Sequence, residues 1–359
     1  MIRERTIAGW ACRWPGPDGI CTLSRMSEPY LVVHVDKRPN VSFEIEQSII
    51  EGGGGRFVAT SSSSEDELIA NVKDAEAILV SSAQITRRVV ESMPKCKLII
   101  RYGVGLDTLD IPAATDHGIV VAHFPDFCQP EVANQTMLLL LACAKKLSML
   151  DRAVRDGSWR PGPLGPMGPI GGETLGLVAL GNIARAVVPR AKAFGLNVMA
   201  YDPYLGEGVF RAQGVERVES LHDLLGRSDY VSVHTPLNPE TRHLIGEAEL
   251  AAMKPTAYLI NTSRGPVVDQ EALIAALDGG QLAGAGLDVF EREPLEAESP
   301  LARMENVVLM PHSASYSDQS FESMRRRVGE TVVGLMEGRW PQFVANPRVR
   351  PRASLPARD

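Results

Sequence analysis

The stretch Thr174-Leu175-Gly176-Leu177-Val178-Ala179-Leu180-Gly181-Asn182-Ile183-Ala184 decides the fold. Residues 174–179 form a short apolar run, which is typical of a buried parallel strand. A helical pattern follows to about Phe194, and the next apolar run, 197–201, ends at Asp202. A strand, a glycine-containing turn, a helix and a second strand make one βαβ unit. This stretch therefore predicts an α/β domain with a parallel sheet.

The same alternation of apolar runs and helical patterns extends on both sides of this unit. There are too many runs for one sheet, and 359 residues is about the length of two domains. The sequence therefore predicts an α/β protein with two doubly wound parallel-sheet domains. The other apolar runs cover residues 30–35, 77–80, 97–100, 118–121, 230–233, 258–260, 283–289 and 307–309.

Composition excludes several classes of function. Hydrophobic residues make up 44% of the chain and charged residues 23%, which is typical of a globular protein. A net charge of −7 gives no electrostatic reason to expect nucleic acid or an anionic membrane as partner. No apolar run approaches the ~20 residues that span a bilayer.

Cysteine usage predicts a cytoplasmic protein with reduced thiols and no metal site. An odd number of cysteines, without a CxxC pair or a nearby His cluster, argues against both a secreted disulfide scaffold and zinc. The cysteines are Cys12, Cys21, Cys96, Cys128 and Cys143.

Proline and glycine mark the boundaries. Residues 1–29 have no periodicity and are expected to be a disordered extension, with Met26 as an alternative translation start. A seam is expected at 125–130, where a helix begins, and residues 161–172 are expected to form a loop. Ser317 and Asp318 are expected to cap a final helix, beyond which the chain after Pro347 is expected to be loose.

The turn at 179–184 has the chemistry of a dinucleotide site. It resembles a GxGxxG motif with an acidic residue about 20 positions further on, although Ala179 replaces the first glycine. Gly181 would let the backbone approach a pyrophosphate at the positive end of the helix, and the small Ala184 would let helix and strand pack. Asp202 would bond both ribose hydroxyls and repel a 2′-phosphate, which favours NAD over NADP. The alternative is an ordinary strand-to-helix turn.

Three polar residues follow apolar strands in the second half of the chain. In a doubly wound sheet, the carboxyl ends of the strands line the ligand crevice, so Arg264, Glu293 and His312 are expected to converge. Arginine suits a substrate carboxylate through its planar fork. Histidine can protonate a developing alkoxide, and a neighbouring carboxylate would fix its tautomer and favour its charged form. Taken singly, each residue is as consistent with a surface or structural role.

Several stretches of the chain form a specific combination of motifs. They are Arg101-Tyr102-Gly103-Val104-Gly105-Leu106-Asp107, Gly172 to Gly176, Arg190 to Gly195 with Tyr201 to Tyr204, Asn261-Thr262-Ser263-Arg264-Gly265, and Pro311-His312-Ser313-Ala314. Together they resemble the D-isomer-specific 2-hydroxyacid dehydrogenase family, and within it most closely the C-terminal binding protein branch. The resemblance covers about residues 30–347.

This resemblance implies a flavodoxin-like substrate domain at 30–127 plus 318–347, a Rossmann NAD domain at 128–317 and a tail at 348–359. It implies a catalytic set on Arg264, Glu293 and His312, and a homodimer formed through the NAD domains. It places the substrate carboxylate at Val104 and Gly105, with Arg101 either a second contact or a brace for that loop. The implied cofactor residues are Thr136, Ala179, Leu180, Gly181, Asn182, Ile183, Asp202, Thr235, Pro236, Thr241, Thr262, Ser263, Asp288 and Ser315.

Two departures from the family pattern matter. Ala179 at the first glycine position is expected to shift the turn slightly and weaken NAD binding. Ser315 stands where the animal co-repressors carry a tryptophan, so the pocket is expected to be more open or more polar. The co-repressors' substrate preference is therefore not transferred.

The predicted activity is hydride transfer between nicotinamide and C2 of a small D-2-hydroxy or 2-keto acid. Glyoxylate, hydroxypyruvate, phosphoglycerate and bulkier keto acids remain open as substrates, and so does the physiological direction. One alternative is an NADH-responsive interaction protein like the co-repressors, which rely on a long tail, whereas few residues follow Pro347 here. Another is a relative that oxidises phosphite.

Overall fold

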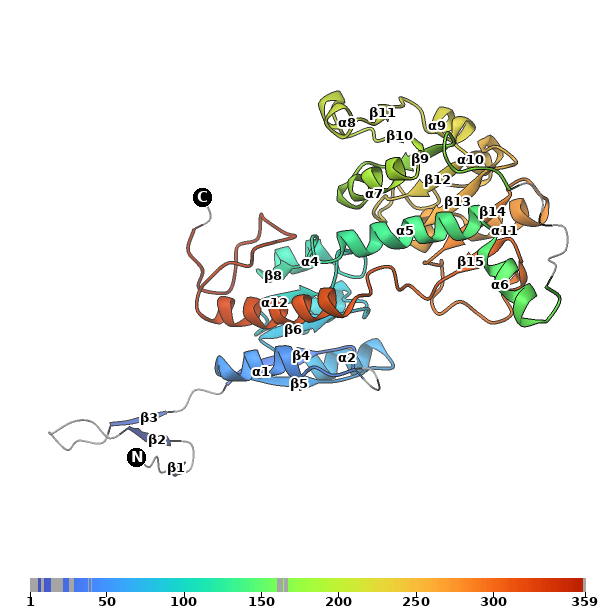
Figure 1. Ribbon diagram of the computed structural model, residues 1–359. Coiled ribbons are helices and arrows are strands. Elements are labelled where there is room, and N and C mark those ends of the chain that lie inside the picture. The colour runs from blue at the N-terminus through green and yellow to red at the C-terminus, as the bar shows by residue number, and fades with distance from the viewer. Residues whose placement is uncertain are drawn as a thin grey trace. The chain divides into compact units, whose positions relative to one another are not determined.

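The strands and helices of this chain gather into two units in a computed structural model (Figure 1). The structure describes residues 6–7, 10–13, 22–25, 29–37, 39, 41–159, 164 and 167–357, with backbone alone for residues 6–25. Unit 1 comprises Met1–Phe124 and Met324–Asp359, and unit 2 comprises Pro125–Ser323. The prediction of an α/β protein with two parallel sheets is confirmed.

Unit 1 contains a five-stranded parallel sheet in the order β5-β4-β6-β7-β8, which is the flavodoxin-like order. All four residues of β6 are buried, because helices cover both faces of such a sheet. The strands are β4 (Tyr30–His34), β5 (Gly55–Ala59), β6 (Ala77–Val80), β7 (Leu98–Arg101) and β8 (Val120–Ala122). The helices are α1 (Glu44–Gly52), α2 (Glu65–Val72), α3 (Arg87–Glu91), α4 (Ile111–Asp116) and, from Met324 onward, α12 (Asp318–Met336).

Unit 2 contains a seven-stranded parallel sheet in the order β11-β10-β9-β12-β13-β14-β15. The strand order reverses between β9 and β12, so the ligand crevice of this Rossmann-type sheet is expected beyond the carboxyl ends of these strands. The strands are β9 (Thr174–Val178), β10 (Asn197–Tyr201), β11 (Glu216–Arg217), β12 (Tyr230–Val233), β13 (Tyr258–Asn261), β14 (Gly284–Leu287) and β15 (Val307–Leu309).

Helices cover both faces of the second sheet (Figure 1). One core lies between the sheet and α5 and α7, and the other between the sheet and α9, α10 and α11. Helix α5 approaches closely at Gly286, where an added Cβ would lie 3.0 Å from Leu139 Cβ. The helices are α5 (Gln129–Ala144), α6 (Leu147–Arg155), α7 (Asn182–Ala193), α8 (Glu207–Gln213), α9 (Leu221–Arg227), α10 (Glu247–Ala252) and α11 (Gln270–Asp278), with short 3₁₀ turns at Gly265–Val267 and Pro300–Arg303.

The two ends of the chain differ from their predictions. Within the segment predicted to be disordered, β1 (Thr6–Ile7), β2 (Trp10–Arg13) and β3 (Thr22–Arg25) pair as an antiparallel sheet, while the rest of residues 1–28 lies outside the described residues. The tail predicted to be loose packs on unit 1. Arg352 donates to the carbonyls of Met93 and Pro94 at 3.0 and 3.1 Å, and its amide bonds to Gly118.

Candidate active site

The turn between β9 and α7 is built around Asp202. One carboxylate oxygen of Asp202 accepts the amide of Leu180 at 3.0 Å, and the other accepts the amide of Tyr204 at 3.0 Å. Ala179, at the first glycine position, takes a left-handed backbone with φ +76°, and its amide bonds to Tyr201. The turn is therefore held in the shape that glycine normally supplies.

This turn fits a dinucleotide. Gly181 caps the twelve-residue helix α7, and a Cβ added there would meet no atom within 4 Å, so the space beside its backbone is open. Asn182 and Ile183 begin the helix, whose first amides point to the space where a pyrophosphate is stabilised. Ala184 is fully buried, as close helix–strand packing requires.

The other predicted cofactor residues follow the ends of strands, except Thr136, which lies in α5. The Thr136 and Thr262 hydroxyls are 2.9 Å apart and buried. Thr235 is buried after β12, and Thr241 donates to the Pro236 carbonyl at 2.6 Å. Ser263 donates two hydrogen bonds, from its amide and its hydroxyl, to the side-chain oxygen of Asn261. The Ser315 carbonyl accepts the Ser320 hydroxyl at 3.0 Å.

His234 is a residue of this crevice that sequence reasoning missed. It directly follows β12, and its Nε2 lies 2.9 Å from the Ser232 hydroxyl. Burial lowers the pKa of His234 to about 4, so the ring is neutral near pH 7. A neutral ring adds no charge at the carboxyl end of β12.

The three predicted catalytic residues lie at the carboxyl ends of neighbouring strands, β13, β14 and β15. His312 Nδ1 lies 2.6 Å from Glu293 Oε2, and the other carboxylate oxygen of Glu293 accepts the Phe290 amide at 3.0 Å. Because Nδ1 faces the carboxylate, Nε2 is the ring nitrogen left to act on a substrate. Arg264 follows β13, with its carbonyl accepting the Asn261 side-chain amide.

The charges of this group are coupled. Burial acts to raise the pKa of Glu293, but the hydrogen bond and charge of His312, the Phe290 amide and the charge of Arg264 outweigh it, so the pKa is lowered. The carboxylate thus stays ionised at neutral pH.

Asp288 has a structural task that the sequence did not indicate. Its carboxylate, fully buried, accepts the amides of Ser313 and Ala314 at 2.8 and 2.9 Å, while its carbonyl accepts the His312 amide at 2.8 Å. Burial raises the pKa of Asp288 despite these bonds. Asp288 therefore fixes the turn in which His312 takes the left-handed φ of +51°. Its predicted contact with the nicotinamide carboxamide stays a prediction.

The segment after Arg264 packs directly on the segment before Glu293. A Cβ added at Gly265 would lie 1.9 Å from the backbone of Phe290, so only glycine fits. His243 Nε2 also pairs with Glu291. These contacts, which sequence reasoning missed, join the segment after Arg264 to the segment before Glu293.

The predicted substrate loop lies in unit 1, after β7. Arg101 donates to the neighbouring Tyr102 carbonyl, which is consistent with the bracing alternative. The Gly103 carbonyl accepts the Phe124 amide at 3.2 Å, and the Val104 carbonyl lies 3.3 Å from His123 Nδ1. With these carbonyls tied down, Val104 and Gly105 are held in a fixed backbone conformation. Whether their amides bind a carboxylate stays a prediction.

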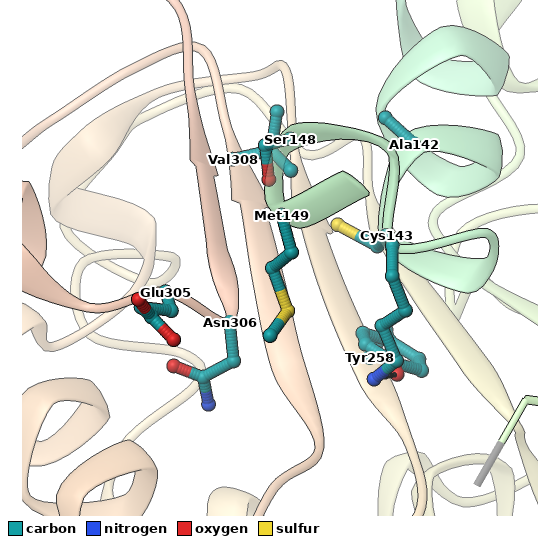
Figure 2. A pocket seen from close by; sticks show the side chains of 9 residues that line it. Ala142, Cys143, Ser148, Met149, Tyr258, Glu305, Asn306 and Val308 are labelled. Carbon is teal, nitrogen blue, oxygen red and sulfur yellow. Dashed lines mark hydrogen bonds between the residues drawn. The ribbon is translucent and has the colours of Figure 1, made fainter. Parts of the chain in front are cut away.

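Two hollows in the described part of the chain bear on the position of the site. One, of about 560 Å³, lies in unit 1 beside Asp36, Ser62 and Ser82, which follow the carboxyl ends of β4, β5 and β6. The other, of about 10 Å³, is lined by Cys143, Tyr258 and other side chains of unit 2 (Figure 2). It has room for one water at most and lies where β13 begins, away from the catalytic group.

Neither a membrane span nor a metal cluster is found in the described part of the chain. No helix there is both long and apolar enough to cross a bilayer. No group of three or more His, Cys, Asp or Glu side chains there is arranged to hold a metal ion. Cys96, Cys128 and Cys143 are free and buried, and burial raises the pKa of each thiol to about 12.

Comparisons with known proteins agree with this geometry. Residues 137–314 match the family model described as D-isomer specific 2-hydroxyacid dehydrogenase, NAD binding domain. The chain is 42% identical over 290 residues to a glyoxylate reductase of Korarchaeum cryptofilum, which covers 80% of this chain and 87% of the relative. It is 38% identical over 299 residues to a D-3-phosphoglycerate dehydrogenase of Methanocaldococcus jannaschii, covering 83% of this chain and 56% of that one.

A comparison with solved structures gives relatives of the same family. A D-lactate dehydrogenase from Aquifex aeolicus, complexed with NAD and lactic acid, superposes with a TM-score of 0.79 at 28% identity, covering 88% of this chain and 99% of that one. The turn between β9 and α7, the Glu293–His312 pair and these likenesses all indicate the same class of enzyme. The chain belongs to the D-isomer specific 2-hydroxyacid dehydrogenase family and is an NAD-dependent oxidoreductase.

Proposed function

We propose that this enzyme interconverts a small 2-keto acid and its D-2-hydroxy acid, with Arg264, Glu293 and His312 as the catalytic residues. The observation that carries the proposal is the 2.6 Å contact between His312 Nδ1 and an ionised Glu293, electrostatically coupled to Arg264. A histidine held in this way can exchange a proton with a substrate oxygen through Nε2. The arginine supplies the positive charge that a 2-keto acid requires.

NADH, when bound, supplies the hydride. In reduction, Arg264 would bind the substrate carboxylate and polarise the carbonyl. Binding of a carboxylate by the backbone amides of Val104 and Gly105, in unit 1, is part of the same proposal. His312 would donate its Nε2 proton to the oxygen as negative charge develops there. Glu293 would stabilise the imidazolium before that transfer and hold its orientation after it. In oxidation, the neutral His312 would accept the proton.

The preference for NAD over NADP is proposed to come from Asp202. Its two oxygens are already held by the amides of Leu180 and Tyr204, so the carboxylate has a fixed position at the end of β10. A fixed negative charge there would accept ribose hydroxyls and repel a 2′-phosphate. NADH and NADPH are therefore to be compared in every assay, with the lower KM expected for NADH.

Glyoxylate is the first substrate to test. Relatives that cover most of this chain are named glyoxylate reductase. Ser315, a small polar residue in the turn after His312, is consistent with an open or polar pocket. The likeness to the C-terminal binding protein branch stays a prediction.

The deciding experiment is a screen of NADH oxidation with glyoxylate, hydroxypyruvate, phosphohydroxypyruvate and bulkier 2-keto acids, using wild type and His312→Ala. We expect turnover with at least one acid, and a loss of kcat of about 10²–10⁴-fold in the variant, as for other general acids. The affinity for NADH should be nearly unchanged. His222→Ala, which removes an exposed histidine remote from the group, is the matched control. Near-normal turnover in His312→Ala would refute the assignment.

The same screen separates the alternatives. Phosphite with NAD⁺ is included to test phosphite oxidation. Absence of turnover on every acid, combined with tight NADH binding, would favour an NADH-responsive interaction protein instead. A cytoplasmic location stays a prediction.

We also propose a homodimer formed through unit 2. Helix α6 has no buried residue, and Leu147 and Val154, seven positions apart and thus on one helix face, are 53% and 56% exposed. Trp159 follows at 79% exposure. An exposed apolar face of this kind marks a protein–protein contact, and a second copy of the chain is the partner we propose.

A further inference from the structure

Unit 1 contains a carboxyl group buried in its interior. Glu46 lies in the first turn of α1 and is 0% exposed. Its Oε1 accepts the phenol of Tyr102 at 3.0 Å, and its Oε2, also buried, has no hydrogen-bond partner in the described part of the chain. Burial raises the pKa of Glu46, so this position is unfavourable for its charge. A hydrophobic residue would pack here at less cost.

Tyr102 is the residue that opens the substrate loop. Its amide bonds to the Val80 carbonyl at 2.7 Å, and its ring meets the His34 ring edge-on with centroids 5.2 Å apart. The phenol therefore points into the unit, toward α1, while the next residues, Gly103 to Gly105, form the loop. The hydrogen bond from Tyr102 to Glu46 thus anchors the first residue of this loop to α1.

Helix α12 packs against α1 beside Glu46. A Cβ added at Gly329 of α12 would lie 3.3 Å from Glu46 Cα, so the two helices pack closely. Arg325, one turn earlier on the same face of α12, lowers the pKa of Glu46 through its charge, although burial dominates. The hydrogen bond from Tyr102 and the charge of Arg325 thus both partly offset the effect of burial on the pKa of Glu46.

We propose that Glu46 and Tyr102 are positioning residues: they hold the loop so that the Val104 and Gly105 amides face the substrate carboxylate. This inference rests on the proposed function of that loop. Neither side chain touches substrate in this scheme. The pair acts by fixing the backbone at Tyr102, and the Phe124 and His123 contacts fix the residues that follow.

The test uses three variants of the full-length enzyme. Tyr102→Phe removes only the hydroxyl, Glu46→Leu removes the acceptor, and Glu46→Gln keeps an acceptor oxygen without the charge. Tyr30→Phe is the matched control, since Tyr30 also donates at 3.0 Å within unit 1, but to the Glu76 carbonyl at the other end of β4. Each variant is assayed for KM toward glyoxylate, KM toward NADH, and binding of oxamate to the enzyme–NADH complex.

We expect Tyr102→Phe and Glu46→Leu to raise KM for glyoxylate and the Kd of oxamate about tenfold, the change expected when one hydrogen bond is lost. KM for NADH should stay within about twofold. Glu46→Gln should retain most of the affinity, and Tyr30→Phe should leave every constant unchanged. A folded Tyr102→Phe enzyme with wild-type KM and oxamate affinity would overturn the proposal.

A measurement without turnover separates this inference from the proposed function. Hydrogen–deuterium exchange of the amides at 103–106 should be faster in Tyr102→Phe than in wild type, and unchanged in Tyr30→Phe. If the exchange rises but no variant or wild type reduces any keto acid, the proposed function fails while the positioning pair stands. If the exchange does not change, the positioning pair fails, whatever the turnover.

Discussion

Ala179 has a backbone conformation that is unfavourable for a residue with a Cβ atom. Its φ of +76° lies in the left-handed region, which costs an L-residue about 1–2 kcal/mol. Bonds on either side hold it there, from its own amide to Tyr201 and from the Leu180 amide to Asp202. The predicted weakening of NAD binding through a shifted turn is therefore replaced by a sharper expectation, in which the turn keeps its shape and the strain is retained.

We predict that Ala179→Gly raises thermal stability. Relief of the strain exceeds the entropy cost of glycine, about 0.5–1 kcal/mol, so the gain should be up to about 1 kcal/mol and Tm should rise by about 1–3 °C. NADH affinity should be equal or tighter. Ala193→Gly, in the last turn of α7 with helical backbone, should lower Tm instead. A fall in Tm for both variants would show that Ala179 is unstrained.

The lowered pKa of Glu293 predicts that the free energy of unfolding depends on pH. Its pKa is lowered in the folded enzyme, so the carboxylate contributes stability above its unfolded pKa, and this contribution is lost as the pH falls through the folded pKa. Glu293→Gln should therefore be less stable than wild type near pH 7, and the gap in Tm should shrink as the solution becomes more acidic. A gap that is constant from pH 7 to pH 3 would contradict the lowered pKa of Glu293.

At the scale of elements, the strands with a continuous apolar run were predictable, and two of the edge strands were not. All ten apolar runs are strands in the structure, including the edge strands β8 and β15, because strands of a parallel sheet covered by helices are apolar. The strands β5 and β11 lie at or near sheet edges and carry polar residues such as Arg56 and Glu216, so they lack that signal. Their pairing comes from the neighbouring strand rather than from their own pattern.

The site was predictable where a polar residue ends an apolar strand. Arg264 and His312 follow this rule, and their strands, β13 and β15, lie on either side of β14 in the sheet. The contacts that hold the site depend on residues distant in sequence, such as His243 with Glu291 and Glu46 with Tyr102. No local pattern contains such pairings.

Gly265 is the point at which the segment after Arg264 packs on the segment before Glu293, so we predict a large effect of Gly265→Ala. The new Cβ would meet the Phe290 backbone at 1.9 Å, and the segment leading to Glu293 would have to move. Stability should fall by about 1–3 kcal/mol, as in overpacked cores, and kcat by about 10²-fold, the effect of a 1 Å misplacement. Denaturant unfolding and steady-state kinetics measure both.

The control for this element is Gly208→Ala in α8, where an added Cβ would meet no atom within 4 Å. It should be neutral or stabilising by about 0.5–1 kcal/mol, because alanine favours a helix. Normal kcat in Gly265→Ala would show that the two segments move independently of one another.

At the scale of the whole molecule, the face of α6 that carries Leu147 and Val154 is exposed in the single chain. Leu147 and Val154 lie on one face of this helix, whereas most charged side chains of α6, such as Asp151 and Arg155, pair with each other. The cost of leaving such a face in water is about 25 cal/mol for each Å² of apolar surface. Covering it with the same face of a second copy, related by a twofold axis, removes that cost for both chains.

We therefore predict that the enzyme sediments at twice 38.9 kDa, and that Leu147→Asp with Val154→Asp converts it to a monomer. Two carboxylates in each face would be desolvated without partners on association, which opposes dimer formation. Val41→Asp, at another exposed apolar position in unit 1, should leave the dimer intact. Analytical ultracentrifugation across a range of concentrations measures both. A wild-type monomer at micromolar concentration, or a double variant that still sediments as a dimer, would exclude α6 as the contact.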